Sequence, residues 1–223
     1  MEKLLPELSQ IDGLTRIRLS YLQPAEMRPS LIQAIAETSK VVPYFDLSFQ
    51  HSSAGILRAM RRFGDSEKFL HLIKQIRAIS PEAGIRSNVI VGFPGESEDD
   101  YQELVNFVSS AHLDAIGVFG YSDEDNTEAL GLDGKVDPEL IRERVENLAS
   151  LVDELVSERA SARIGQEISV LIEDSELQEG RAEHQGPEVD GSTSFIGTDF
   201  PVGEYVRARV SETIGADLIA EAI

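Results

Sequence analysis

Hydrophobic positions follow two spacings up to about residue 160. Short apolar runs at 15–22, 44–49, 85–93 and 114–122 have the composition of β-strands. Between these runs, apolar residues recur three and four positions apart, which is the spacing of an amphipathic helix. One such stripe consists of Phe69, Leu72, Ile73 and Ile76. Strands that alternate with helices predict right-handed crossovers and a parallel sheet, either open or closed as a barrel.

Several helix starts are marked in the sequence. Ser53 is a candidate N-cap, and Ser97 with Asp100 has the spacing of a capping box. Asp137 followed by Pro138 predicts a long helix that ends near residue 160. The apolar run that precedes Ser97 predicts a parallel strand buried on both faces. Active sites on such sheets lie at the carboxyl ends of the strands, so we expect the functional site there.

The pattern changes after Gly165. Five short strand-like runs, EISVLIED, GRAEH, STSFIG, GEYVRARVSE and ADLIAEAI, are separated by Gly, Pro, Asp and Ser. This spacing predicts a small antiparallel β-barrel of the OB type. The sequence therefore predicts two domains, residues 1–160 and residues 161–223.

Acidic residues outnumber basic ones, with 40 Asp and Glu against 20 Lys and Arg and a net charge of −20. Residues 161–223 alone carry four arginines against thirteen acidic residues. Because RNA-binding domains are usually basic, this charge favours a positively charged partner. The alternative is the ordinary acidic surface of a soluble or salt-adapted protein.

The chain has no apolar run long enough to span a bilayer, and MEKLLPELSQ lacks the basic start and the cleavage site of a signal peptide. We therefore expect a cytoplasmic protein with no membrane partner.

The 223 residues include no cysteine. Disulfides, thiolate nucleophiles and cysteine-ligated iron–sulfur clusters are thus excluded within this polypeptide.

The segment NVIVGFPGESEDDY, residues 88–101, joins a predicted strand to a predicted helix through Gly92, Pro94 and Gly95. It lacks the lysine and the spacing of a Walker phosphate loop, which excludes that type of nucleotide hydrolysis. Gly92 has no side chain, so a flat ligand such as an adenine could lie against the backbone there. The alternative is an ordinary tight turn between a strand and a helix.

Four segments occur in the order found in one family: LSYLQP, YFDLSFQHSSAGILRAMRR, IRSNVIVGFPGESEDDY and GVFGYSDEDNT. Together with the terminal barrel they resemble the radical S-adenosylmethionine (SAM) methylthiotransferases, which end in a TRAM domain. The resemblance covers nearly the whole chain. It implies an α/β fold in which residues 1–160 are the C-terminal portion of a partial TIM-type (radical SAM) barrel and residues 161–223 are an OB-like TRAM barrel.

The resemblance also implies cofactors. Members of the family use SAM and two [4Fe–4S] clusters that cysteines hold, and one cluster cleaves SAM to a radical. None of those cysteines is present in this chain. We therefore expect the clusters to be held by the N-terminal half of such an enzyme, which becomes a partner of this chain, and we expect the chain alone to be inactive.

The phrases QGPEVDG, FQHSS and GVFGYS resemble the branch of the family that methylthiolates an aspartate of a small-subunit ribosomal protein. Ribosomal proteins are basic, which agrees with the acidic barrel. We therefore expect a basic small-subunit ribosomal protein as the partner, and we do not expect RNA. The alternatives are a non-catalytic module that binds such a protein and the branch that modifies transfer RNA.

Matching the motifs position by position yields two sets of candidate residues, with no catalytic and no metal-binding assignment. The set expected to contact SAM consists of Gln50, His51, Arg86, Asn88, Val91 and Gly92. The set expected to contact the substrate consists of Tyr121, Arg181, His184, Glu188 and Asp190. His51 considered alone is either a hydrogen-bonded rim residue or a catalytic base.

The chain departs from the family pattern at a few positions. Ser48 stands where the family usually has proline, and Asn88 stands where aspartate is common. Asp123 and Asn126 replace the usual proline and glycine. We expect four of about six barrel strands, which leaves an unpaired sheet edge through which the chain could associate with itself.

Overall fold

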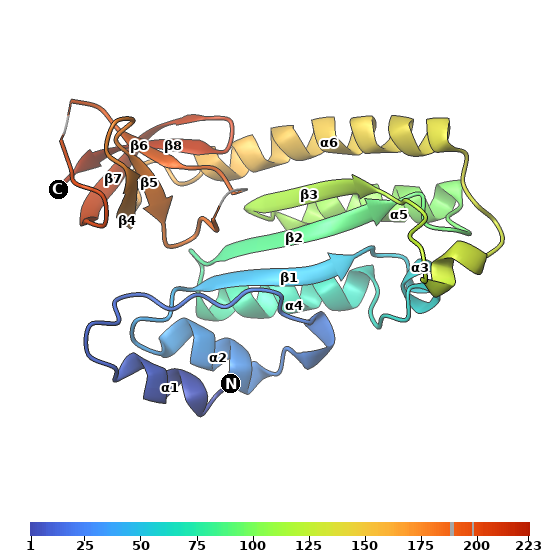
Figure 1. Cartoon of the computed structure of the whole chain (residues 1–223), viewed down its shortest axis with the longest axis horizontal. Coiled ribbons are helices and arrows are strands. Elements are labelled where there is room, and N and C mark those ends of the chain that lie inside the picture. Colours follow the sequence, from blue (N-terminus) through green and yellow to red (C-terminus); the bar gives the residue numbers. More distant parts are fainter. Residues whose placement is uncertain (188–189, 198) are drawn as a thin grey trace.

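A computed structural model describes residues 1–187, 190–197 and 199–223 of the chain. Glu188, predicted to contact the substrate, lies outside the described residues. A three-stranded sheet with flanking helices is followed by a closed five-stranded barrel (Figure 1). The first body contains α1 (Leu4–Ser9), η1 (Pro24–Glu26), α2 (Pro29–Glu37), β1 (Tyr44–Gln50), α3 (Ala54–Ala59), α4 (Ser66–Ile79), β2 (Gly84–Val91), α5 (Glu98–Ala111), β3 (Ala115–Gly120), η2 (Glu128–Gly131) and α6 (Pro138–Ser161). The barrel contains β4 (Glu167–Asp174), β5 (Glu179–Ala182), β6 (Thr193–Phe195), β7 (Tyr205–Ile214) and β8 (Asp217–Ala222).

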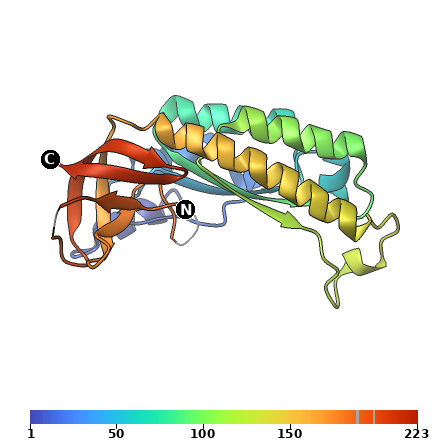
Figure 2. The same ribbon diagram turned by 90° about the horizontal axis from the view of Figure 1, so that it is seen from above.

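The sheet is parallel and has the order β1-β2-β3. Helices α4, α5 and α6 form a layer over one face, and the opposite face carries no helix layer (Figure 2). The core between sheet and helices centres on Phe49, Phe69 and Phe107, whose ring centroids lie 4.5 to 6.0 Å apart. One buried face therefore holds the sheet together, and the other is free to form a site.

The predicted helix starts are confirmed. The Ser53 side chain accepts a hydrogen bond from the backbone N–H of Gly55 and so caps α3. Ser97 and Asp100 form a reciprocal capping box at α5. The Asp137 side chain caps α6, with Pro138 at its first position. These signals are local, because the groups that satisfy one another lie within three residues in the sequence.

Two sequence expectations about the sheet are wrong. The run at 15–22 forms only isolated parallel bridges, from Ile17 to Val41 and from Leu22 to Leu47, so the sheet has three strands and not four. Tyr21 has a left-handed backbone (φ 58°), which interrupts an extended pairing. The second expectation, burial of β2 on both faces, also fails: its residues alternate between buried and half-buried positions from Ile85 onward.

The C-terminal barrel has the strand order β4-β5-β6-β8-β7 and closes through pairing of β4 with β7. This is the order expected of an OB-type barrel. The predicted antiparallel arrangement holds for all pairs except β6 and β8, which run parallel. Its interior is a separate apolar cluster that includes Val170, Ile172, Ala208 and Val210.

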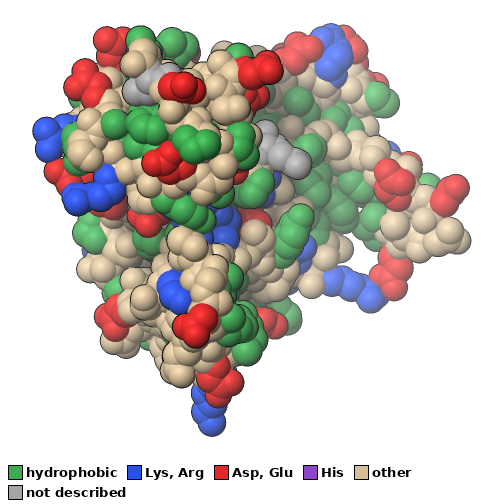
Figure 3. All heavy atoms as spheres, turned by 60° about the vertical axis from the view of Figure 1, so that its left-hand side comes forward, with side chains coloured by type: hydrophobic (Ala, Val, Ile, Leu, Met, Phe, Trp, Pro, Cys, Tyr) green, Lys and Arg blue, Asp and Glu red, His purple; other side chains and the backbone are tan. Residues whose placement is uncertain are grey.

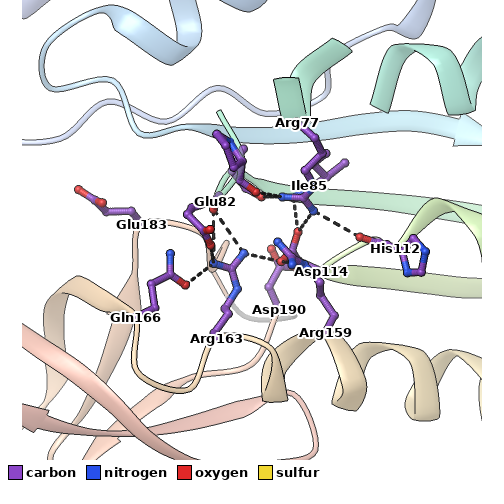
Figure 4. Close-up of polar contacts among 12 residues, drawn as sticks. Arg77, Glu82, Ile85, His112, Asp114, Arg159, Arg163, Gln166, Glu183 and Asp190 are labelled. Atoms are coloured by element: carbon purple, nitrogen blue, oxygen red, sulfur yellow. Dashed lines mark hydrogen bonds and ion pairs between the residues drawn. The ribbon is translucent and has the colours of Figure 1, made fainter. Parts of the chain in front are cut away.

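The barrel docks at the amino ends of the sheet strands, opposite to their arrowheads (Figure 1). Asp114, just before β3, is at the centre of this contact (Figure 4). Its carboxylate accepts hydrogen bonds from Arg77 at 2.7 Å, Arg159 at 3.0 Å and Arg163, and from the backbone N–H of Ile85 at 2.9 Å. Burial raises the pKa of Asp114, but the three guanidinium groups outweigh it and hold that pKa well below its usual range.

The two bodies also meet through backbone at Gly84. A Cβ built on Gly84 would lie 2.4 Å from the carbonyl oxygen of His184. Two backbones can approach this closely only where one residue has no side chain. The sequence requirement at the start of β2 is therefore set by a residue one hundred positions away.

We predict that Gly84→Ala destabilises the fold by about 1–3 kcal/mol, because the added methyl meets backbone that no rotamer change can move. The measurement is the free energy of unfolding in urea. The matched control is Gly55→Ala, whose Cβ would lie 3.6 Å from the Ser53 Oγ in ordinary contact. Because Gly55 is helical, this control should be neutral or stabilising by about 0.5–1 kcal/mol. Equal losses in both variants would contradict the prediction.

A second prediction concerns pH. Burial, aided by the nearby Arg163 charge, lowers the pKa of His184 to about 3. Unfolded histidine has a pKa of about 6.5, so between these values the unfolded chain binds a proton that the folded chain does not. Stability should therefore fall as the pH drops below about 6.5, by up to about 1.4 kcal/mol per pH unit from this one group.

The check is urea unfolding at a series of pH values between 7 and 5. His184→Gln should have a shallower pH dependence of stability than the unchanged chain. His71→Gln, at an exposed helical position, serves as the control and should keep the original slope. Identical slopes in all three proteins would refute the assignment to His184.

Candidate functional site

The open face of the sheet is lined by alternate residues of its strands, because successive side chains of a strand point to opposite faces. Gln50 of β1 and Asn88 and Ile90 of β2 belong to this row, together with Phe119 of β3. Phe119 is 53% exposed, whereas Val89 and Val91, on the helix side of β2, are fully buried. The row therefore presents amides and an aromatic ring to a space that the sheet does not fill.

At the carboxyl ends of the strands this face opens into a cavity of about 840 Å³. Its walls include Gln50, Asn88, Phe119 and Tyr121, and residues of η2 close one side. This size suits a ligand of cofactor dimensions, and apolar walls with a few polar groups are typical of such sites. The sequence predicts the functional site at the carboxyl ends of the strands, and this cavity lies there.

Gln50 lies at this rim with an unusual backbone. Its φ of 68° is in the left-handed region, and the pairing register between β1 and β2 shifts between Leu47 and Gln50. Such conformations cost free energy for a residue with a side chain and concentrate at functional sites. Tyr121 lies on the opposite side of the cavity, where its hydroxyl donates to Asp123 at 2.7 Å.

His51 does not face the cavity. It is completely buried behind the rim, where its Nδ1 accepts from the Ser53 backbone N–H at 3.0 Å and its Nε2 lies 3.2 Å from Glu96. Since Nδ1 accepts, Nε2 carries the proton and donates it to the carboxylate. The sequence left His51 as either a hydrogen-bonded residue or a catalytic base. Its contacts in the structure are those of a hydrogen-bonded residue.

Glu96 is the central acceptor of this buried cluster. It accepts from the Gly92 backbone N–H at 2.9 Å, from His51, and from Arg144 of α6 at 2.6 Å. Arg144 also donates to Glu98 at 2.8 Å. Glu96 thus pins the turn after β2 to both β1 and α6. Sequence reasoning missed Glu96 and Arg144, because their side-chain partners lie more than forty positions away.

Gly92 and Val91 lie behind the cavity wall as well. A Cβ on Gly92 would fall 2.4 Å from the Ile141 side chain, so the space freed by this glycine is filled by α6 and not left for a ligand. The expectation that Gly92 leaves room for a flat ligand is therefore wrong. Its φ of 80° provides a second reason for glycine, since a left-handed turn follows the strand. The predicted role of Gly92 in cofactor binding remains a prediction.

Arg86 lies toward the amino end of β2, on the side of the barrel. Its guanidinium contacts Asp46 at 3.0 Å and Asp190 at 3.0 Å. Asp190 in turn accepts from the Tyr44 hydroxyl and from the Gly186 backbone N–H. The segment QGPEVDG, which carries the family resemblance, therefore contributes its buried aspartate to the contact between the two bodies.

The remaining predicted substrate residues are also engaged internally. Arg181 donates to the Gly191 carbonyl at 2.8 Å and pairs with Glu173 at 3.1 Å. His184 is only 8% exposed. The structure thus divides the predicted residues among three places: Gln50, Asn88 and Tyr121 at the cavity, His51, Val91 and Gly92 behind it, and Arg86, Arg181, His184 and Asp190 at or near the barrel contact.

Comparison with known proteins matches both bodies. The family model of the Radical SAM superfamily matches residues 1–108, and that of the TRAM domain matches residues 164–223. Among solved structures, coproporphyrinogen III oxidase (HemN) from Escherichia coli, described as a radical SAM enzyme, superposes with a TM-score of 0.53 at 16% identity. The match covers 74% of this chain and 37% of HemN, and it shows the fold alone. The two bodies are thus a radical SAM fold and a TRAM domain.

Curated relatives narrow this class. The chain is 58% identical over 226 aligned positions to the ribosomal protein uS12 methylthiotransferase RimO of Saccharopolyspora erythraea, and the match covers 100% of this chain and 47% of that protein. RimO of Nocardioides sp. is also 58% identical, over 99% of this chain and 47% of the relative. The chain therefore belongs to the radical SAM methylthiotransferase family and is RimO-like. It spans about half the length of the curated relatives it matches.

We predict that Glu96→Gln destabilises the chain by about 3 kcal/mol, because it leaves the Arg144 guanidinium buried without its strongest partner. Urea unfolding measures the loss. Glu98→Gln is the matched control: it removes a carboxylate from the same arginine, but its side chain is 72% exposed. The control should lose less than about 1 kcal/mol. Comparable losses would show that the burial of Glu96 is not decisive.

Proposed function

We propose that this chain supplies one wall of the SAM site and the TRAM domain of a RimO-type methylthiotransferase. The observation that carries the proposal is the row of open-face residues, Gln50, Asn88 and Phe119, ending in an 840 Å³ cavity at the carboxyl ends of β1, β2 and β3. Ligands of α/β sheets bind at that edge. The family match over the whole chain supports SAM as the ligand.

The residues present fit SAM in size and chemistry. Gln50 and Asn88 offer amide donors and acceptors, and Phe119 offers an aromatic face for stacking. Val91 and Gly92, which lie behind the wall, would support it, since Glu96 accepts from the Gly92 backbone N–H and lies 3.2 Å from His51. When bound in enzymes of this family, SAM supplies a radical and a methyl group. The role of these residues is to bind and orient it and to exclude water.

The residues present do not fit an iron–sulfur cluster, since the sequence contains no cysteine thiolate. We propose that both [4Fe–4S] clusters of the complete enzyme are held by the part of the relatives' length that this chain does not match.

Among the described residues, no helix has the length and apolar character to cross a bilayer. A cytoplasmic location and a domain boundary near residue 161 are further parts of the proposal.

We propose a basic ribosomal protein as the substrate, bound in part by the TRAM barrel. Figure 3 shows acidic side chains scattered among hydrophobic ones over the barrel end of the molecule. Leu177 and Val202 are 68% and 60% exposed, and the acidic Glu176 and Glu204 lie beside them in the chain. The two segments adjoin, because the Gln178 side-chain amide donates to the Phe200 carbonyl at 3.1 Å and accepts from the Phe200 backbone N–H at 2.8 Å. An apolar surface between carboxylates suits a basic segment with hydrophobic side chains.

Salt dependence of binding tests the choice of partner. A basic small-subunit ribosomal protein should bind the chain at low salt, and the double variant Glu176→Lys with Glu204→Lys should weaken that binding at least tenfold. The double variant Glu212→Lys with Glu221→Lys, at exposed positions of β7 and β8, changes the net charge equally, serves as the control and should have a smaller effect. Salt-dependent binding of a transfer RNA tighter than that of the protein would favour the other branch of the family.

Complementation tests the enzyme assignment. The chain should yield 5′-deoxyadenosine from SAM only when it is reconstituted anaerobically with iron, sulfide and the remaining half of a RimO relative, and is then given a one-electron reductant such as dithionite, which the reductive cleavage of SAM consumes. Stoichiometric iron binding by these 223 residues alone would contradict the proposal.

We also propose that the open sheet edge permits self-association of the chain. Sedimentation of the isolated chain measures it.

A further inference from the structure

Arg86 joins three parts of the molecule through one side chain. Its Nε lies 3.0 Å from Asp190 of the barrel, one terminal nitrogen donates to Asp46 of β1 at 3.0 Å, and the other donates to Asn88 of β2 at 3.1 Å. The side chain is only 15% exposed. A planar guanidinium with two hydrogen-bond acceptors and one ion-pair partner at these positions has one orientation, which a flexible ammonium could not reproduce.

Asn88 receives its orientation from this contact. Its side-chain oxygen accepts from Arg86 and lies against Gly117 of β3, where a Cβ would come within 2.5 Å of that oxygen. The amide plane is thereby fixed, with its oxygen toward Arg86. Its two N–H donors have no partner among the described residues, and Asn88 lines the cavity. The cavity wall therefore presents donors at this position.

Asp190 fixes the other end of Arg86. Besides its ion pair with Arg86, its carboxylate accepts hydrogen bonds from the Tyr44 hydroxyl and from the Gly186 N–H at 2.8 Å. A Cβ on Gly186 would lie 2.2 Å from the Tyr44 hydroxyl, so the close approach of the barrel loop depends on this glycine. A line of direct contacts thus runs from the TRAM barrel through Asp190 and Arg86 to the Asn88 amide in the cavity.

We propose that Arg86 is a positioning residue through which the docked TRAM barrel orients the Asn88 amide, so that the cavity offers two donors to an oxygen of its ligand. The identification of that ligand as SAM rests on the proposed function. The acceptor is a carboxylate or a ribose oxygen. Since aspartate at position 88 could not donate, Asn88 selects for an acceptor group in the ligand.

The test is the pair of side-chain amide resonances of Asn88 in nitrogen-15 spectra of the full chain, assigned by their loss in Asn88→Ala. Asp190→Asn and Arg86→Lys should each shift both resonances, because the Asn88 side-chain oxygen loses the fixed Arg86 donor that orients the amide. Arg207→Lys, at an exposed arginine paired with Glu167 on the barrel, is the matched control. It should leave both resonances unchanged.

Unchanged Asn88 resonances in a folded Asp190→Asn variant would overturn the proposal. If that variant or Arg86→Lys does not fold, Tyr44→Phe removes one hydrogen bond to Asp190 and retains both ion pairs of Arg86. It should shift the Asn88 resonances by a smaller amount, and no shift would again count against the coupling.

Titration with SAM separates this proposal from the proposed function. Saturable shifts of the Asn88 amide are expected in the unchanged chain, with affinity at least threefold weaker in Arg86→Lys. 5′-Methylthioadenosine, which lacks the amino acid carboxylate, should shift the amide equally if the acceptor is the ribose and not at all if it is the carboxylate. Absence of any response to SAM would contradict the cofactor wall, whereas the ligand-free shifts would still decide the coupling.

Discussion

One carboxylate, that of Asp114, receives three guanidinium groups at the place where the sheet, two helices and the barrel meet. Arg77 comes from α4, Arg159 from α6, and Arg163 from the segment that leads into the barrel. Loss of the Asp114 carboxylate would leave three guanidinium groups close together without their shared partner, and an unpaired buried charge costs several kcal/mol. The contact therefore fixes the packing of the helix layer and the direction in which the barrel leaves it.

The two polar clusters of the sheet have different tasks. At the carboxyl ends, Glu96 holds the turn after β2 from behind and leaves the open face to the cavity. At the amino ends, Asp114 and Asp190 bind arginines in the contact that holds the barrel against the sheet. On the open face, the charged groups that hold the barrel at the amino ends are thus separated from the amides that remain available to a ligand at the carboxyl ends. Arg86 and Asn88, two residues apart on one face of β2, are the point where the two regions meet.

The sequence predicted those features whose cause is local. Caps at Ser53, Ser97 and Asp137 were identified correctly because donor and acceptor lie within one helical turn. The strand predicted at 15–22 failed because pairing depends on the neighbouring strand and on the backbone at Tyr21, which apolar spacing does not report.

The candidate site shows the same division. The family motifs singled out Gln50 and Asn88, and both residues line the cavity. They could not reveal that Arg86 and Asp190 bind each other, since these residues are 104 positions apart and their charges look available in the sequence. The role of Glu96 could not be predicted for the same reason. Its partners Arg144 and His51 lie far away in the sequence and reach it from other elements. Non-local ion pairs, and not hydrophobic patterning, account for most of what was missed.

Helix α6 has a consequence for any protein that touches both ends of this molecule. It runs as one 24-residue element from the loop beside the cavity to the barrel (Figure 1). At 1.5 Å per residue it measures about 36 Å, and it has no internal proline or glycine at which to bend. It therefore acts as a rigid spacer. A bound polypeptide that contacts the barrel while its reacting residue enters the cavity must bridge that length, which roughly ten or eleven extended residues can do.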